Sequence, residues 1–159
     1  YTAFVSQKPF CIRYPRGNVH YDKVDQYELI PIGSWTRYDV GDKPICIVIS
    51  YGYDVDNVIH KAKENNISMI VINARFFKPI DTIMINELCS YDLPIYVYET
   101  DCKIGSLSSA ILEYINTQKH ILNTIGIEDH FVNHGSIRTL RIQEHIDTQS
   151  LFKEIIEND

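Results

Sequence analysis

The run ICIVIS at residues 45–50 decides the fold class, because five apolar residues stand in succession and four of them are β-branched. Such a run is typical of a strand in a sheet that is covered on both faces. Runs of the same kind recur as SMIVIN at 68–73 and LPIYVYE at 93–99, and HILNTIGI at 120–127 contains a fourth. A weaker candidate strand, SWTRYD at 34–39, precedes them.

Segments with helical periodicity lie between and after these strands. Apolar residues recur at three- and four-residue spacing in DVDNVIHKAKEN, residues 54–65, where Asp54 is the expected N-cap. Asp81 is expected to cap the next helix. Three further helices are predicted, at about 106–115, 137–145 and 148–157.

Strands that alternate with helices of about 10 to 15 residues form βαβ units, and the right-handed crossover rule places helices on both faces of the sheet. The pattern therefore predicts an α/β domain with three layers, α/β/α, around a mostly parallel five-stranded sheet. We expect this domain to run from about residue 28 to residue 159.

Residues 1–14 do not continue the alternation of strands and helices seen in this domain. Residues 1–8 read as the last turns of a helix, which Pro9 ends. Residues 10–14, FCIRY, then read as a strand with Cys11 buried, as we also expect for Cys46.

Composition excludes several classes of function. The chain has 159 residues, 45% of them hydrophobic, and a formal net charge of −6, which argues against a general nucleic-acid binder. No apolar run approaches the roughly 20 residues that span a bilayer, so no membrane partner is predicted. The four cysteines fit no CxxC metal pattern and are expected to be free thiols in the cytoplasm.

Two arginines flank a proline at the end of the predicted N-terminal strand, in RYPRGN at residues 13–18. Side chains alternate along a strand, so Arg13 points away from the face shared by Ile12 and Tyr14. Arg16 would then emerge at the carboxyl end, where open α/β sheets bind ligands. A guanidinium there can grip a phosphate or carboxylate with two hydrogen bonds, although the residues alone favour an ordinary interdomain ion pair.

The order of motifs resembles the C-terminal part of the 1-deoxy-D-xylulose-5-phosphate synthases, a thiamine-diphosphate-dependent family of the transketolase superfamily. RYPRGN and NARFFKPID at 73–81 are the most specific pieces of this resemblance. The supporting pieces are LIPIGSW at 29–35, ICIVISYG at 45–52, IYVYET at 95–100, KIGSLSS at 103–109 and IGIEDHFVNHG at 125–135. The resemblance covers essentially the whole chain.

The resemblance implies a division of the chain and a role for Arg16. Residues 1–27 would be the tail of a pyrimidine-binding domain with its linker, and residues 28–159 a transketolase C-terminal domain. Arg16 would hold the phosphate of glyceraldehyde 3-phosphate, which the parent enzyme condenses with pyruvate to make a precursor of isoprenoids, thiamine and pyridoxal. The upstream domains of the same chain would be the main partners, and the parent enzyme would be a homodimer.

No catalytic, cofactor-binding or metal-binding residue is predicted within this chain. The family needs a Gly-Asp-Gly…Asn segment for Mg²⁺ and the diphosphate, and a glutamate for the aminopyrimidine ring, and neither is found in this sequence. Thiamine diphosphate and Mg²⁺ are therefore expected in the full-length enzyme only, and the isolated fragment is expected to be inactive. His130 and His134 have a spacing that suits zinc on a helix, but Asn133 and Gly135 indicate a loop.

Four charged residues are interpreted as structural or interface residues: Arg13, Arg75, Lys78 and Glu99. KIGSLSS places serines at a helix N-terminus, which can bind anions, although a capped helix start is the preferred interpretation. The family usually has a second acid where Thr100 stands and a second glycine where Ser106 stands. Two alternatives stay open: a stand-alone α/β interaction or regulatory module, and an E1β-like subunit of a 2-oxo acid dehydrogenase.

Overall fold

The structure, a computed structural model, describes residues 1–14, 26–115 and 122–158. Its strands form one sheet in the order β1-β3-β2-β4-β5. They are β1 Thr36–Val40, β2 Cys46–Ser50, β3 Met69–Asn73, β4 Ile95–Cys102 and β5 Leu122–Ile127. β1 pairs with β3 in the antiparallel sense, and all other pairs are parallel. The predicted five-stranded, mostly parallel sheet is confirmed.

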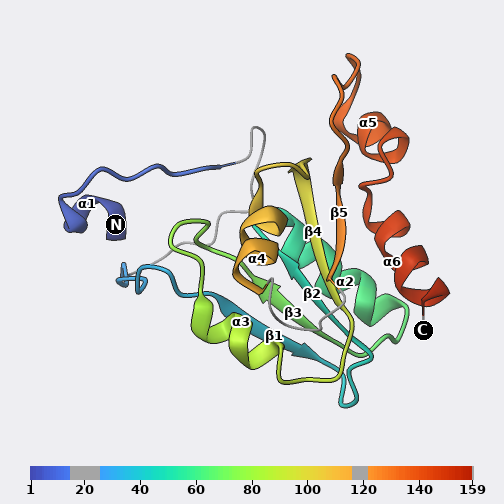
Figure 1. Cartoon of the computed structure of the whole chain (residues 1–159), viewed down its shortest axis with the longest axis horizontal. Coiled ribbons are helices and arrows are strands. Elements are labelled where there is room, and N and C mark those ends of the chain that lie inside the picture. The colour runs from blue at the N-terminus through green and yellow to red at the C-terminus, as the bar shows by residue number, and fades with distance from the viewer. Residues whose placement is uncertain (15–25, 116–121, 159) are drawn as a thin grey trace.

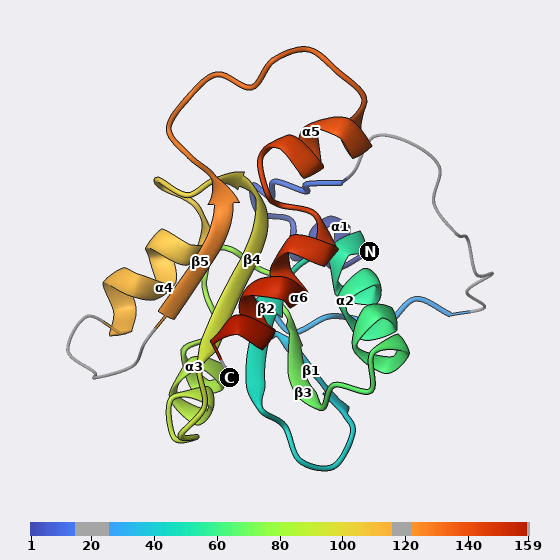
Figure 2. The ribbon, with the colours of Figure 1, turned by 90° about the vertical axis from the view of Figure 1, so that its right-hand side faces the viewer.

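Helices cover both faces of this sheet, as Figures 1 and 2 show. One face carries α2 Tyr53–Glu64 and α6 Thr148–Glu157, and the other carries α3 Thr82–Leu88 and α4 Leu107–Ile115. The three-layer prediction is confirmed too. Within the described residues, no helix is both long and apolar enough to cross a bilayer.

The two-sided core follows directly from the apolar runs. In β2, Val48 joins the cluster under α2 and α6, whereas its neighbours Ile47 and Ile49 join the cluster under α3 and α4. In β4, Tyr98 faces the first cluster and Val97 the second. Because successive side chains point to opposite faces, a strand covered on both sides buries its side chains in both directions, which explains the unbroken apolar runs.

The N-terminal segment departs from the prediction. α1 spans Thr2–Ser6, close to the expected helix, but residues 10–14 belong to no strand. Cys11 is exposed there, which contradicts its predicted burial. A strand needs a neighbour to satisfy its backbone, and the described part of the chain offers this segment none. In Figure 1 the segment extends away from the sheet with α1 at its end.

The predicted cap at Asp54 is also wrong. α2 begins after Gly52, which is the N-cap, and Asp54 lies in the first turn. Its carboxylate instead accepts two hydrogen bonds from Arg141, at 2.6 and 3.0 Å. Arg141 belongs to α5, Ile137–Gln143, so the pair connects the start of α2 to a helix near the other end of the chain. Asp81 does cap α3 as predicted, by accepting from the Met84 N–H.

Candidate functional site

The strand order reverses direction between β2 and β4. The chain passes from β2 to β3 on one side, and then crosses to β4 on the other side of β2. In open α/β sheets the crevice at such a point, beyond the carboxyl ends of the strands, is where ligands bind. Tyr51 follows β2 at this edge, and Asp101 lies near the end of β4.

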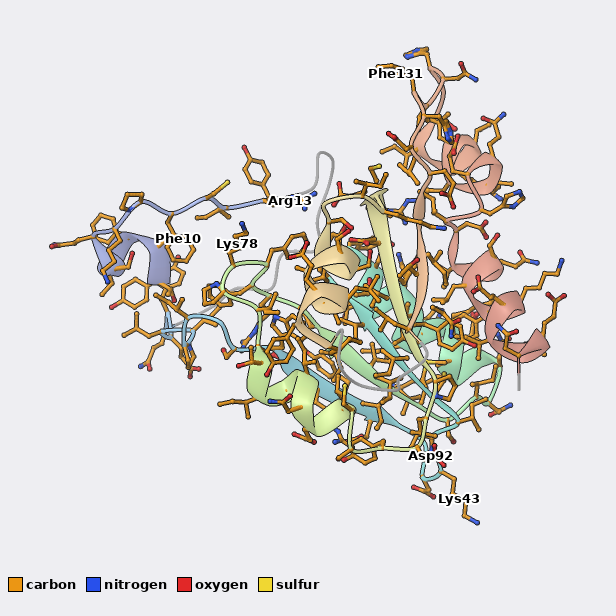
Figure 3. The ribbon with its side chains drawn as sticks, in the orientation of Figure 1. Phe10, Arg13, Lys43, Lys78, Asp92 and Phe131 are labelled. Atoms are coloured by element: carbon orange, nitrogen blue, oxygen red, sulfur yellow. The ribbon has the colours of Figure 1, made fainter. Side chains whose placement is uncertain are left out.

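Arg13 reaches into this region from the N-terminal segment (Figure 3). Its Nη2 donates to Asp101 Oδ2 at 2.6 Å, and the Tyr51 hydroxyl donates to the same oxygen, also at 2.6 Å. The guanidinium lies over the Phe77 ring, with its carbon 5.0 Å from the ring centre, and 5.7 Å from that of Tyr51. We call Tyr51, Phe77 and Asp101 the Arg13 seat.

The electrostatics of the Arg13 seat favour a charged guanidinium and a neutral phenol. The hydrogen bond that Arg13 donates to Asp101 raises the pKa of Arg13 above its usual value. Burial, and then the hydrogen bond to Asp101, raise the pKa of Tyr51, so its hydroxyl keeps its proton and donates it to the carboxylate. The edge-on packing of Tyr51 and Phe77, with ring centres 4.8 Å apart, holds the phenol in place.

A hollow of about 350 Å³ adjoins the Arg13 seat. It is lined by Arg13, Phe77, Asp101, Cys102, Ile104, Gly105 and Ser106. Its floor is therefore formed by the end of β4 and the turn into α4.

The side chain of Glu99, which belongs to the same chain, caps the N-terminus of α4. Only 1% of Glu99 is exposed, and its carboxylate accepts from the N–H groups of Leu107 and Ser108 at 3.2 and 3.3 Å. Ser106 donates its hydroxyl to the same carboxylate at 2.6 Å. The helix end is thus already filled by an acid, which agrees with a capped start, and little of Glu99 is accessible to another chain. Its interface role stays a prediction.

Arg75 and Lys78 lie in the connection between β3 and α3. Arg75 donates to the carbonyl and the hydroxyl of Ser34 at 3.2 and 2.7 Å, so it fastens this connection to the segment before β1. Lys78 is exposed, and Figure 3 shows it near the N-terminal segment. The ring of Phe10 packs edge-on against Phe76 of the same connection. Arg16 lies outside the described residues, and its phosphate-binding role stays a prediction.

The loop after β5 carries the two histidines considered above. His130 pairs with Glu144 at 2.8 Å, and Phe131 at the tip is fully exposed (Figure 3). No group of three or more His, Cys, Asp and Glu side chains suited to a metal ion occurs among residues 1–14, 26–115 and 122–158. No residue of this loop is brought to the Arg13 seat.

Sequence reasoning found Arg13 but not its three partners. Tyr51 and Asp101 both follow the apolar part of a buried strand, which was the signal available for placing them at the carboxyl edge. Phe77 gave no such signal, because it lies within the connection between β3 and α3 and not directly after a strand.

Comparison with known proteins gives a consistent assignment. Residues 38–149 match the family described as "Transketolase, C-terminal domain". A 1-deoxy-D-xylulose-5-phosphate synthase of Aquifex aeolicus is 33% identical over 98% of this chain and 25% of its own length. A synthase of the same name from a Geobacillus species is 32% identical over 88% of the chain and 23% of its own length. This chain therefore spans about a quarter of the curated relatives that it matches.

A solved structure agrees at the level of the fold. The chain titled "Split gene transketolase, inactive beta4 tetramer" superposes with a TM-score of 0.67 over 81% of this chain and 43% of its own length. The two sequences are 19% identical, so the likeness concerns the arrangement of helices and strands.

Proposed function

This chain belongs to the family of transketolase C-terminal domains, and from that premise we propose that it is the C-terminal part of a 1-deoxy-D-xylulose-5-phosphate synthase. The observation that carries the proposal is the 33% identity to such a synthase, spread over 98% of this chain. The reaction joins pyruvate to glyceraldehyde 3-phosphate with loss of carbon dioxide. Its product leads to isoprenoids, thiamine and pyridoxal.

The cofactor chemistry belongs to other parts of the proposed enzyme. Thiamine diphosphate, bound with Mg²⁺, supplies the electron sink for such reactions. The residues described here do not fit that group, because the N-terminus of α4, which could have received a diphosphate, is filled by Glu99. We therefore derive no catalytic step from this chain and propose that it binds neither thiamine diphosphate nor Mg²⁺.

The proposed contributions of this chain are substrate binding and assembly. Arg16 holds the phosphate of glyceraldehyde 3-phosphate and so orients the acceptor for addition. Arg13, Arg75 and Lys78 support the contact between this domain and the upstream cofactor-binding domains, and Glu99 supports it indirectly by fixing the N-terminus of α4. The parent enzyme is proposed to be a cytoplasmic homodimer.

The exposed surface of the N-terminal segment supports an arrangement with further domains. Phe4 and Tyr14 are 85% and 84% exposed, and Ile12 is 64% exposed. Tyr27 and Leu29, which come after residue 25, are also mostly exposed. Large apolar side chains with this exposure are what a surface covered by other domains would present.

The test uses the full-length protein that contains this chain. We expect Arg16→Ala to raise the KM for glyceraldehyde 3-phosphate by at least tenfold and to leave the KM for pyruvate unchanged, because only the acceptor carries the phosphate that Arg16 binds. Arg138→Ala, at an exposed position of α5, is the matched control. Steady-state kinetics with both substrates give the result. An unchanged KM for glyceraldehyde 3-phosphate would remove Arg16 from the proposal.

The isolated chain provides a second test. We expect no turnover from it, and no heat of binding when thiamine diphosphate and Mg²⁺ are added in a calorimeter. Binding with micromolar affinity would contradict the proposal that the cofactor binds to other parts of the enzyme and not to this chain.

A further inference from the structure

The charged side chains at the carboxyl edge of the sheet are paired with one another. Arg13 pairs with Asp101 at 2.6 Å, and Lys103, in the turn after β4, pairs with Glu128 at 2.5 Å. A small anionic ligand needs donors whose charge is not already compensated. A protein surface does not need such donors, and a paired charge costs less to bury than an unpaired one. These pairs therefore favour a protein over a small anion at this edge.

Apolar side chains around these pairs face the solvent. Ile104 follows Lys103, lines the hollow beside Arg13 and is 71% exposed. Ile12 and Tyr14, on either side of Arg13, are mostly exposed as well. Side chains alternate along an extended segment, so the contact of Arg13 with the domain turns both neighbours outward. Aromatic residues are enriched at the centre of protein interfaces, so this composition suits a docking face.

Phe131 extends this apolar surface onto the loop after β5. Its side chain is fully exposed, and in Figure 3 it lies at the same end of the molecule as Arg13, opposite Lys43. The pair between Lys103 and Glu128 connects the start of this loop to the turn after β4. We call the following four residues the edge surface: Ile12, Tyr14, Ile104 and Phe131.

The loop that presents Phe131 is braced against α5. His130 pairs with Glu144 at 2.8 Å, at the end of that helix. Gly135 lies so close to Leu140 that an added Cβ would be 3.1 Å from the leucine Cδ2. A side chain on a braced support enters a pocket of its partner at a low ordering cost. Single aromatic side chains of this kind carry much of the energy of an interface.

The partner that fits the edge surface is the part of the polypeptide that precedes Tyr1. The Aquifex aeolicus relative matches this chain over 25% of its own length, so about three quarters of that protein lie outside the match. Residues 8–14 run from α1 to the Arg13 seat, so a domain before Tyr1 is connected to this domain through the edge surface. Such a tether raises the effective concentration of the preceding domain at this face above that of an independent protein.

We propose that the edge surface is the docking face for the upstream domains, with Phe131 as its anchor. The inference rests on the proposed function, because it takes this chain as the C-terminal part of a longer enzyme. It gives a role to the loop after β5. It also assigns a protein partner to an edge where open α/β sheets usually bind small ligands.

The experiment uses the full-length protein that contains this chain, with p-benzoyl-L-phenylalanine in place of Phe131. This amino acid keeps an aromatic ring and, on irradiation, forms a covalent bond to groups in contact with it. We expect mass spectrometry to map the crosslinks to residues that precede Tyr1. The same replacement at Ile156, which is 58% exposed near the end of α6, is the control and should give no such crosslink.

Two results of this experiment would overturn the inference. Crosslinks from position 131 to residues 1–159 would mean that this chain, or a second copy of it, covers the ring. The absence of any crosslink would mean that nothing covers it.

Hydroxyl-radical footprinting of the unmodified full-length protein gives an independent measurement. Each rate of side-chain oxidation is divided by its rate in the urea-unfolded protein. We expect Phe131 and Ile104 to react about fivefold more slowly than Ile156, because the centre of an interface is shielded from water. Phe131→Ser should raise the rate at Ile104, and Ile156→Ser should not. Equal rates at Phe131 and Ile156 would contradict the proposal.

The outcomes separate the inference from the proposed function. Synthesis of 1-deoxy-D-xylulose 5-phosphate by the full-length protein tests the proposed function. If this activity is present but Phe131 reacts freely and forms no upstream crosslink, the inference is overturned and the proposed function stands. If the activity is absent but the crosslinks map upstream, the docking face is supported and only the proposed activity fails. Should Phe131→Ser not fold, the crosslinks decide.

Discussion

The molecule contains two Asp–Arg pairs of the same length in very different surroundings. Arg13 and Asp101 are 2.6 Å apart with side chains 57% and 35% exposed. Arg141 and Asp54 are also 2.6 Å apart, but their side chains are 26% and 9% exposed. Water screens the first pair, so its net contribution to stability is small. The second pair has lost most of its water, so either partner left alone would be costly.

The difference in exposure corresponds to a difference in role: the buried pair holds the fold together, and the exposed pair holds a segment in place. The Asp54–Arg141 pair connects α2 to α5 inside the domain. The Arg13–Asp101 pair connects the domain to the N-terminal segment, which extends away from the sheet. Distance alone would give the two pairs equal weight, and solvent exposure ranks them.

The largest expected effect tests the buried pair. Arg141→Ala leaves the Asp54 carboxylate buried without its cation, and we expect a loss of about 3 kcal/mol in the free energy of unfolding. Urea unfolding at pH 7 measures it. Arg138→Ala, on the same helix but exposed, should stay within about 0.5 kcal/mol of the unchanged chain. A loss of similar size in both variants would mean that helix propensity, and not the pair, determines the effect.

An intermediate effect is expected at alkaline pH, where tyrosines near the two pairs titrate. Burial, and then the charge of Asp54, raise the pKa of Tyr98 to about 12. In the unfolded chain its pKa is about 10. The folded state therefore binds the proton more tightly. This contribution is complete below pH 10 and is lost as pH rises from about 10 to 12, and at pH 11 the loss is about 1.4 kcal/mol.

Urea midpoints between pH 8 and 11 measure this loss. Tyr51, whose pKa is raised as well, adds to it in the same direction. Tyr98→Phe should flatten the profile above pH 10 and, because the hydroxyl donates to the Ile146 carbonyl at 2.7 Å, should also lower stability at pH 7. A profile as steep in Tyr98→Phe as in the unchanged chain would contradict the assignment.

The smallest expected effect tests the exposed pair. Asp101→Asn should change the free energy of unfolding by less than about 1 kcal/mol. In 1 M NaCl, where the screening length is about 3 Å, even this difference should nearly vanish, while the Arg141→Ala loss persists. The measurement is urea unfolding at low and high salt. A salt-independent loss of several kcal/mol in Asp101→Asn would place the two pairs in one class and remove the contrast between them.

The fold could be predicted because its information is local. An apolar run such as 45–50 indicates a strand that is covered on both faces. Because helices alternate with these runs, a parallel sheet between two layers of helices is the expected architecture. The strand predicted at 10–14 was wrong. An apolar stretch indicates a preference for burial, but a strand also needs a neighbouring strand to pair with.

The site could be predicted only in part, because its partners are distant in sequence. Asp101 stands 88 residues from Arg13, and Asp54 stands 87 residues from Arg141. A local pattern assigned Asp54 to a helix cap, and the tertiary partner was stronger. For Arg13 the residues alone favoured an ordinary ion pair, and the chemistry of the Arg13 seat could not be read from RYPRGN itself.

Glu99, whose carboxylate caps the start of α4, has a consequence for anion binding at this helix end. Bare helix ends attract whatever small anions the surrounding solution holds, from chloride to nucleotides. Glu99, carried on the preceding strand, occupies that position at a fixed stoichiometry and cannot diffuse away. This end of α4 therefore has its first N–H groups satisfied within the domain and does not depend on an anion from solution.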